Sequence, residues 1–172
     1  MIDRRTLIGG AAALEPAVAW AVDRQTVRTR LIGSWKLKDA VTVNTSTGET
    51  SVFFGWRRPY SGILVYGASG DMSAQLCANR ENPVTGGPFK GMDQRLRIAY
   101  LDTYYSYFGR FEVDEAQSRV HHLVEASLDP TEVGLTYVRL VEFDEDVLKL
   151  STTERRFSTG TGSVNRLSWT RA

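Results

Sequence analysis

Two runs of strand-forming residues, separated by a short polar turn, constrain this chain more than any other feature. Residues 105–113 and 119–127 are rich in aromatic and β-branched side chains, and residues 114–118 between them are polar. This pattern predicts a β-hairpin. Both histidines of the chain, His121 and His122, lie in its second strand. Any imidazole chemistry in the chain therefore belongs to this hairpin.

The same strand-forming habit recurs along the chain and predicts about nine short strands. Over residues 31–43 apolar and polar side chains alternate, which is the period of a half-buried strand. Residues 92–103 space their apolar side chains as a short helix does, and residues 79–91, with two prolines and three glycines, are predicted to form a long loop. The remaining strands are expected at residues 50–54, 62–67, 72–78, 135–143, 147–153 and 164–171.

Many short strands with closely spaced turns and no internal repeat predict a single all-β domain, either an antiparallel sandwich or a closed barrel. A chain of 172 residues can bury a core without covalent cross-links. Cys77 is the only cysteine, so no intramolecular disulfide can form. The net charge is +1 and the basic residues are scattered, which argues against a nucleic-acid-binding protein.

The N-terminal segment, residues 1–21, has the features of an export signal. Arg4 and Arg5 precede a short apolar run, as in twin-arginine signals, and residues 19–21 form the Ala-x-Ala pattern that a signal peptidase cleaves. Glu15 departs from this pattern because it places a charge where the segment should be apolar. The alternative interpretation is an amphipathic arm on a cytoplasmic protein.

Export predicts a mature chain that starts near Val22, so that residues 22–172 form the domain and the protein is periplasmic or secreted. The apolar run at residues 7–13 is too short to cross a bilayer. No transmembrane anchor is therefore expected.

Several segments, taken together in this order and spacing, resemble the bacterial lipocalin-like domain family. They are LIGSW at 31–35, which includes the Gly-x-Trp signature of lipocalins, P-x-SGILVYGASGDMSAQL at 59–76, YFGRFEVDE at 107–115 and HHLVEASL at 121–128. The chain departs from the family pattern at Tyr104-Tyr105 and at Ser118, where relatives often carry a turn glycine. The resemblance implies an antiparallel up-and-down β-barrel of about 8–10 strands with one short helix and a central cavity.

The resemblance also implies a structural role for the signature tryptophan. In lipocalins this residue packs at the closed end of the barrel under an arginine of the last strand. Trp35 is the corresponding residue here, and Arg166 or Arg171 is its expected partner, through a cation–π contact.

Alternate residues of a strand in a small barrel point into the lumen. If the hairpin turn pairs Glu115 with Arg119, His121 and Glu125 face the lumen beneath aromatic side chains. In this register the expected ligand-binding residues are Tyr105, Tyr107, Phe111 and Leu123. A shift by one residue would exchange the two faces, and a turn without glycine leaves the register open.

The chemical hypothesis for this hairpin assigns His121 as a base or hydrogen-bond donor and Glu125 as a group that polarises the ligand or acts as general acid. The two lie about 13 Å apart by strand rise, so they would contact a ligand from two ends. The alternative is that both satisfy strand ends, as buried polar groups usually do. His122 is expected to form a surface ion pair with Glu112.

No metal site or cofactor is expected, because adjacent histidines on a strand point to opposite faces and no haem-attachment motif is present. A Ser-His-Asp hydrolase is not expected either, since the chain has no Gly-x-Ser-x-Gly motif. Two function classes remain. The first is an exported barrel that binds a small hydrophobic or aromatic molecule. The second is a cofactor-free isomerase, cyclase, dehydratase or lyase that uses His121 and Glu125 for proton transfer. A structural or partner-binding protein is disfavoured, since nothing predicts a long exposed apolar patch.

Overall fold

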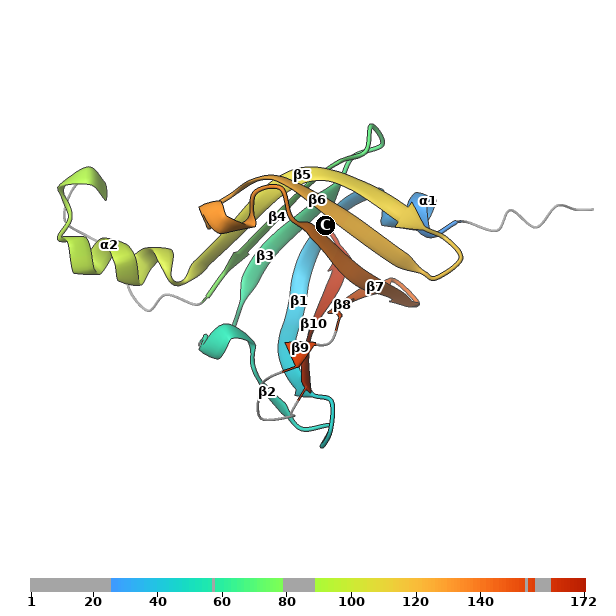
Figure 1. The fold of residues 1–172 in the computed structure, drawn as a ribbon, viewed down its shortest axis with the longest axis horizontal. Helices are drawn as coiled ribbons and strands as arrows, with labels where there is room; N and C mark the ends of the chain where they lie inside the picture. The colour runs from blue at the N-terminus through green and yellow to red at the C-terminus, as the bar shows by residue number, and fades with distance from the viewer. Residues whose placement is uncertain (1–25, 57, 79–88, 154, 157–161) are drawn as a thin grey trace, which may run out of the picture.

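The chain forms an antiparallel sheet that closes on itself (Figure 1). The computed structural model describes residues 26–56, 58–78, 89–153, 155–156 and 162–172. The strands are β1 (Gly33–Asn44), β2 (Thr50–Val52), β3 (Ser61–Tyr66), β4 (Asp71–Cys77), β5 (Tyr104–Asp114), β6 (Arg119–Ser127), β7 (Thr136–Asp144), β8 (Val147–Thr152), β9 (Arg155–Arg156) and β10 (Gly162–Arg171). The helices are α1 (Val27–Leu31) and α2 (Gln94–Leu101), with the 3-10 turns η1 (Phe53–Gly55), η2 (Phe89–Gly91) and η3 (Pro130–Glu132).

Eight of the described strands make the barrel, in the order β1-β3-β4-β5-β6-β7-β8-β10, and β10 pairs back onto β1. Sequence neighbours are therefore also neighbours in space, apart from the short β2 and β9, which pair with β1 and β10 beyond the closed part. The β1–β10 pairing excludes the sandwich. The up-and-down barrel implied by the lipocalin-like resemblance is confirmed.

The start of the first strand differs from the prediction. The strand expected over residues 31–43 begins at Gly33, because residues 27–31 form α1. Five residues are too few to display a helical period, so the sequence pattern predicted no helix there.

Two other predicted elements also have different bounds. The strand expected over residues 50–54 ends at Val52, where the chain turns into η1. The helix expected over residues 92–103 is present as the shorter α2. Most of the predicted loop at residues 79–91 lies outside the described residues.

Side chains that alternate along the strands fill the barrel. On β4, Met72, Ala74 and Leu76 are buried while the residues between them are more exposed, and Leu148 and Leu150 follow the same period on β8. Burying a large apolar side chain stabilises the fold by about 1.5–3 kcal/mol. The period-2 pattern in the sequence therefore becomes one continuous core.

The α1 segment closes one end of the barrel. The indole Nε1 of Trp35 donates a hydrogen bond to the carbonyl oxygen of Leu31 at 2.8 Å, and the guanidinium of Arg171 lies 3.9 Å from the centre of the Trp35 ring. Arg171 also donates to two carbonyl oxygens just before β1. Of the two expected partners of Trp35, Arg171 makes the contact, while Arg166 lies on the outer face.

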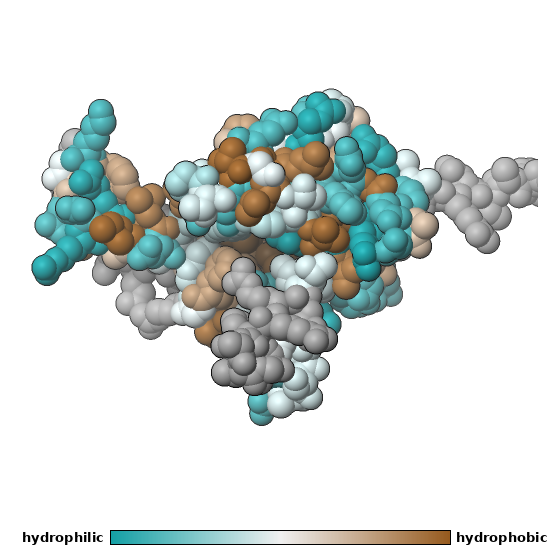
Figure 2. All heavy atoms as spheres, viewed as in Figure 1, coloured by the Kyte–Doolittle hydropathy of each residue, from teal (hydrophilic) through white to brown (hydrophobic). Residues whose placement is uncertain are grey.

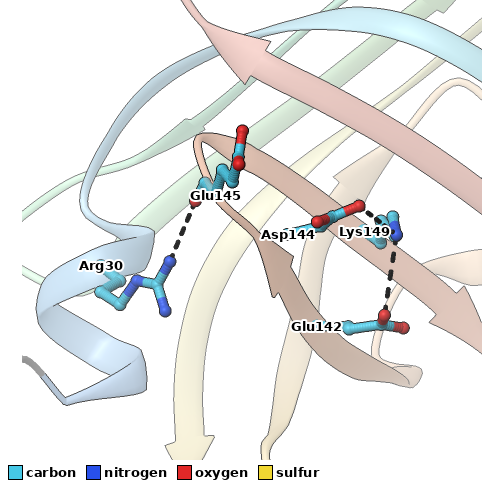
Figure 3. Close-up of polar contacts among 5 residues, drawn as sticks. All are labelled: Arg30, Glu142, Asp144, Glu145 and Lys149. Carbon is cyan, nitrogen blue, oxygen red and sulfur yellow. Dashed lines mark hydrogen bonds and ion pairs between the residues drawn. The ribbon is translucent and has the colours of Figure 1, made fainter.

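A second attachment of α1 runs to the turn between β7 and β8 (Figure 3). Arg30 donates to the carbonyl oxygen of Glu145 at 3.2 Å. On the adjacent strands Lys149 lies 2.9 Å from Asp144 and 3.7 Å from Glu142. Exposed ion pairs of this kind contribute little to stability. Two hydrogen bonds therefore tie α1 to the barrel, that of Trp35 at Leu31 and that of Arg30 at Glu145.

The register of the β5–β6 hairpin is shifted by one residue from the predicted one. The turn pairs Asp114, not Glu115, with Arg119, so His121 lies opposite Glu112 and His122 lies opposite Phe111. The predicted lumen placement of His121 and the predicted ion pair of His122 with Glu112 are therefore wrong.

The turn itself explains the shift. The Asp114 carboxylate accepts a hydrogen bond from the backbone N–H of Gln117, and Ser118 adopts a left-handed backbone with φ of 49°. The Glu115 carboxylate is occupied elsewhere, since it accepts from the backbone N–H groups of Val27 and Arg28 at the start of α1. A long-range contact to α1 thus sets where the hairpin pairing ends.

A β-bulge bends the same hairpin between Phe108 and Gly109. Gly109 pairs with Val124, and a Cβ at Gly109 would lie only 1.9 Å from the carbonyl oxygen of Leu123. Glycine is therefore required at this position by close backbone approach. The bulge leaves Glu125 without a strand partner on β5, on the exposed side of β6.

The end of the barrel opposite α1 carries η3 and the protruding α2 (Figure 1). Leu96 and Ile98 on α2 are exposed, and apolar atoms are visible on this segment in Figure 2. Neither α2 nor any other helix among the described residues has the length and apolar character needed to cross a membrane.

Candidate functional site

Two adjacent hollows that share five lining residues lie between the closed end of the barrel and the solvent. The inner one, here called the inner chamber, has a volume of about 70 Å³, and the outer one, the mouth, about 630 Å³. The residues that line both, here called the neck, are Phe54, Tyr105, Arg139, Thr152 and Asn165. The rest of the inner chamber consists of Phe53, Leu64, Ala74, Leu76, Tyr107, His122, Leu150, Leu167 and Trp169.

His122 on β6 is fully buried in the core, with 1% of its surface exposed. Its Nε2 atom lies 2.7 Å from the hydroxyl of Tyr66 on β3, and its Nδ1 atom lies 2.8 Å from the hydroxyl of Tyr107 on β5. Both ring nitrogens therefore have a phenol partner. The pairing satisfies an imidazole that would otherwise be costly to bury.

Burial sets the ionisation of this triad. Desolvation, together with the nearby charge of Arg139, holds the pKa of His122 well below its usual range. Desolvation likewise raises the pKa of Tyr66 and of Tyr107, and in Tyr107 the nearby positive charge of Arg139 partly opposes this rise. At neutral pH all three groups are therefore uncharged.

Trp169 on β10 lines the floor of the inner chamber. Only 2% of its surface is exposed, and its indole Nε1 has no hydrogen-bond partner in the described part of the chain. Buried donors are rarely left unpaired in folded proteins. This orphan N–H is thus available to a molecule inside the chamber.

The neck is formed largely by aromatic rings. Phe54, in the η1 turn, lies 5.8 Å from the Tyr105 ring and 5.4 Å from the Trp56 ring, both edge-on. Its backbone is left-handed with φ of 49°, which is unfavourable for a bulky side chain. The fold thus holds this half-exposed ring in place at the entrance to the inner chamber.

The polar groups of the mouth are paired with one another. The Glu132 carboxylate accepts hydrogen bonds from the hydroxyls of Tyr105 at 3.0 Å and Ser127 at 2.6 Å. Burial raises the pKa of Tyr105, and burial with a hydrogen bond to Glu132 raises the pKa of Tyr137 to about 12. The Arg139 guanidinium lies 4.8 Å from the centre of the Tyr137 ring, and no carboxylate of a described residue forms an ion pair with it.

The predicted ligand-binding residues fall into two groups. Tyr107 and Tyr105 line the inner chamber and its neck. Phe111 is buried in the core outside the chamber lining, with its ring centre 4.8 Å from that of Tyr66. Leu123 lies on the outer face, opposite Arg110. The predicted lumen position of Leu123 is therefore wrong, for the same one-residue shift that moves His121.

The two predicted catalytic residues do not lie in the cavity. His121 is half-buried on the outer face and Glu125 is exposed at the bulge. Neither lines the inner chamber or the mouth. Among the described residues, no three histidine, cysteine, aspartate or glutamate side chains are grouped to hold a metal ion.

The sequence interpretation missed His122, Tyr66, Trp169 and Arg139. A signal for Arg139 was present, because it lies on the same face of β7 as the apolar side chains of Tyr137 and Val141. Tyr66 and Trp169 likewise lie on the same face of their strands as other buried residues. The importance of His122 depended on the register, which the turn alone did not reveal.

The family comparison agrees with this architecture. The model of the lipocalin-like domain matches residues 32–172. The chain belongs to this family. The matched region begins one residue before β1 and runs to the C-terminus, so it includes every strand of the lipocalin-like barrel.

One curated relative of this lipocalin-like chain is the 4'-hydroxy-3'-methoxypropiophenone carrier protein ppsC of Aspergillus oryzae. The two are 34% identical over 105 residues, which cover 57% of this chain and 94% of the relative. Among solved structures, EF1p2_mFAP2b bound to DFHBI matches 86% of this chain and 100% of its own, with 11% identity and a TM-score of 0.44.

Proposed function

We propose that this lipocalin-like protein binds a small aromatic molecule in its inner chamber and neck and carries it without converting it. The observation that carries the proposal is a mainly apolar chamber whose rim of Phe54, Tyr105, Arg139, Thr152 and Asn165 also lines the wide mouth of the barrel. Ligand sites typically combine an apolar lining with a few placed polar groups. The relative named as a carrier of an aryl ketone supports the same class of ligand.

The neck supports an aromatic ligand in particular. The rings of Phe54 and Tyr105 stand at its rim, 5.8 Å apart, and Arg139 lies on the same rim. Edge-on ring contacts and a guanidinium over a ring each favour a planar aromatic guest by about a kcal/mol. An aliphatic molecule of the same size would gain only the burial of its surface.

The alternative of an enzyme is not favoured by a specific observation. Proton transfer by His121 and Glu125 would require both in the cavity, and both lie on the outer side of β6. His122 does line the inner chamber, but both its nitrogens are engaged with tyrosines and burial lowers its pKa. Such a group is suited to fixing a hydrogen-bond network rather than to collecting protons from solvent.

The proposal is tested by direct calorimetry with 4'-hydroxy-3'-methoxypropiophenone as the probe. We expect saturable binding with one site per chain. A Thr152→Trp variant, which fills the neck with an indole, should weaken binding at least tenfold. If the unmodified protein gave no detectable heat of binding with this probe, the proposal would be contradicted.

A matched control separates blocking from damage to the fold. Leu140 is exposed on the outer face of β7, so Leu140→Trp adds the same indole outside the barrel. This variant should bind the probe as the unmodified protein does. Equal weakening by both variants would show that the neck is not the route to the binding site.

We further propose that the chain is exported and that the binding domain is residues 22–172. The support is the paired arginines at Arg4 and Arg5 and the Ala-x-Ala pattern at residues 19–21. Residues 1–21 lie outside the described part of the chain. A binding barrel outside the cytoplasm would collect or deliver its ligand across the cell envelope.

A further inference from the structure

The hydrogen-bonding capacity of the inner chamber is unbalanced. None of its lining residues, including those of the neck, is an aspartate or a glutamate. The Asn165 side-chain oxygen accepts from the hydroxyl of Thr42 at 2.8 Å, and the Thr152 hydroxyl accepts from the backbone N–H of Asn165 at 3.0 Å. These acceptors are therefore already engaged, and two donors are left free.

The first free donor is the indole N–H of Trp169. It is buried at the floor of the chamber and no acceptor among the described residues reaches it. Leaving such a group unpaired costs about 1–3 kcal/mol. An acceptor atom brought by a ligand would recover this cost.

The second free donor follows from the proton count of the Tyr66–His122–Tyr107 triad. A neutral imidazole has one N–H, so it donates to one tyrosine and accepts from the other. If His122 donated to Tyr66, the Tyr66 hydroxyl proton would be buried without an acceptor among the described residues, since His122 is its one partner there.

The opposite arrangement places the unpaired donor at the inner chamber instead. Tyr66 then donates to Nε2 of His122, and the Nδ1–H of His122 donates to the Tyr107 oxygen. The Tyr107 hydroxyl proton is released toward the inner chamber, which Tyr107 lines and Tyr66 does not. Arg139, which also lines the chamber, adds to the same polarity, because a guanidinium has donors and no acceptor.

We propose that the inner chamber is a carbonyl-binding pocket and that the ligand is an aromatic carbonyl compound whose oxygen accepts hydrogen bonds from Trp169 and Tyr107. This inference rests on the proposed binding function and names its ligand class. The carbonyl end occupies the small chamber, and the ring lies in the neck between Phe54 and Arg139. A cationic ligand is disfavoured, since the lining includes the Arg139 guanidinium and no carboxylate.

A pair of probes that differ only at the carbonyl tests the inference. 4'-Hydroxy-3'-methoxypropiophenone and 2-methoxy-4-propylphenol share the ring, the hydroxyl, the methoxyl and the three-carbon chain, but the second lacks the ketone. We expect the ketone to bind about tenfold more tightly in calorimetry. The propylphenol has no carbonyl oxygen, so the donors of the chamber form no hydrogen bond with it at this position.

Two variants locate the donors. Trp169→Phe and Tyr107→Phe keep an aromatic ring but remove the N–H or O–H, and each should reduce the ketone preference several-fold while changing propylphenol binding little. Tyr104→Phe is the matched control, since it removes a phenol hydroxyl that bonds Gln75 outside the barrel. It should leave the preference unchanged. Circular dichroism checks that each variant folds.

The outcomes separate this inference from the proposed function. Equal affinity of the two probes for the unmodified protein, with binding retained, overturns the carbonyl pocket and leaves a binding barrel. A ketone preference that survives both Trp169→Phe and Tyr107→Phe also overturns it. Failure of both probes to bind contradicts the binding function itself.

Discussion

A single buried imidazole decides much of the character of this barrel. His122 bridges two tyrosine hydroxyls from β3 and β5 and thereby ties three strands together inside the core. Its neighbour His121 differs from it in environment, although the two are adjacent in sequence. Successive residues of a strand point to opposite faces, so one histidine lies in the core and the other on the outer surface.

The burial of neutral His122 predicts that stability falls in mild acid. Below pH 6.5, the usual pKa of the group, the unfolded chain takes up a proton that the folded chain refuses. The unfolded state is then favoured by about 1.4 kcal/mol for each pH unit over which folded His122 stays neutral. Urea unfolding between pH 7.5 and 5 should therefore show a decreasing free energy of unfolding.

The matched pair His122→Gln and His121→Gln identifies the group responsible. His122→Gln should have lower stability at pH 7.5, because two tyrosine hydroxyls lose their partner, but a flatter dependence on pH. His121→Gln should keep the steeper dependence. If the His121 variant were the one that flattened the curve, the titrating group would lie on the outer face.

At the level of elements, the β5–β6 hairpin shows how the registry of a barrel is set. The bulge at Gly109 brings two backbones into contact, with the Leu123 carbonyl oxygen where a side chain would begin. It also shifts the pairing so that Gly109 lies opposite Val124 and Phe108 opposite Ala126. Bulges of this kind bend a strand and help close a barrel.

Substituting Gly109 should therefore be costly. In Gly109→Ala the added methyl overlaps the opposite backbone, which must separate, so we expect a loss of stability of about 2–4 kcal/mol in urea unfolding. Gly91→Ala is the control, since a Cβ there meets no atom within 4 Å. A Gly109→Ala protein as stable as the control would mean that the bulge can relax without loss.

The hairpin also marks the limit of prediction from sequence. The two strands, their turn and the alternation of faces were all readable from residues 105–127. The register was not, because it depends on the Asp114 turn contact and on Glu115 bonding α1, a helix that is distant in sequence. The predicted and observed registers differ by one residue, which exchanges the two faces of the strand. The histidine that faces the interior is therefore His122 and not His121.

At the level of the whole molecule, the architecture was far more predictable than the site. Strand number and closure follow from many short alternating segments together with the lipocalin-like motifs, which are local in sequence. The chamber lining instead joins Tyr107, His122 and Trp169 from three strands, and a fourth strand supplies Tyr66, which bonds His122. No local pattern links such residues, since only the closed sheet brings them together.

The whole chain also includes the N-terminal segment, and its predicted fate can be measured. The cap at the start of α1, where Glu115 accepts from Val27 and Arg28, lies downstream of the proposed cleavage near Val22, so processing would leave the domain intact. In a host with a twin-arginine system, we expect the periplasmic protein to have an intact mass that starts near Val22. Arg4→Lys with Arg5→Lys should retain the chain in the cytoplasm, whereas the control Arg24→Lys, beyond the cleavage point, should still be exported. A periplasmic protein whose mass still includes Met1 would contradict the proposed signal.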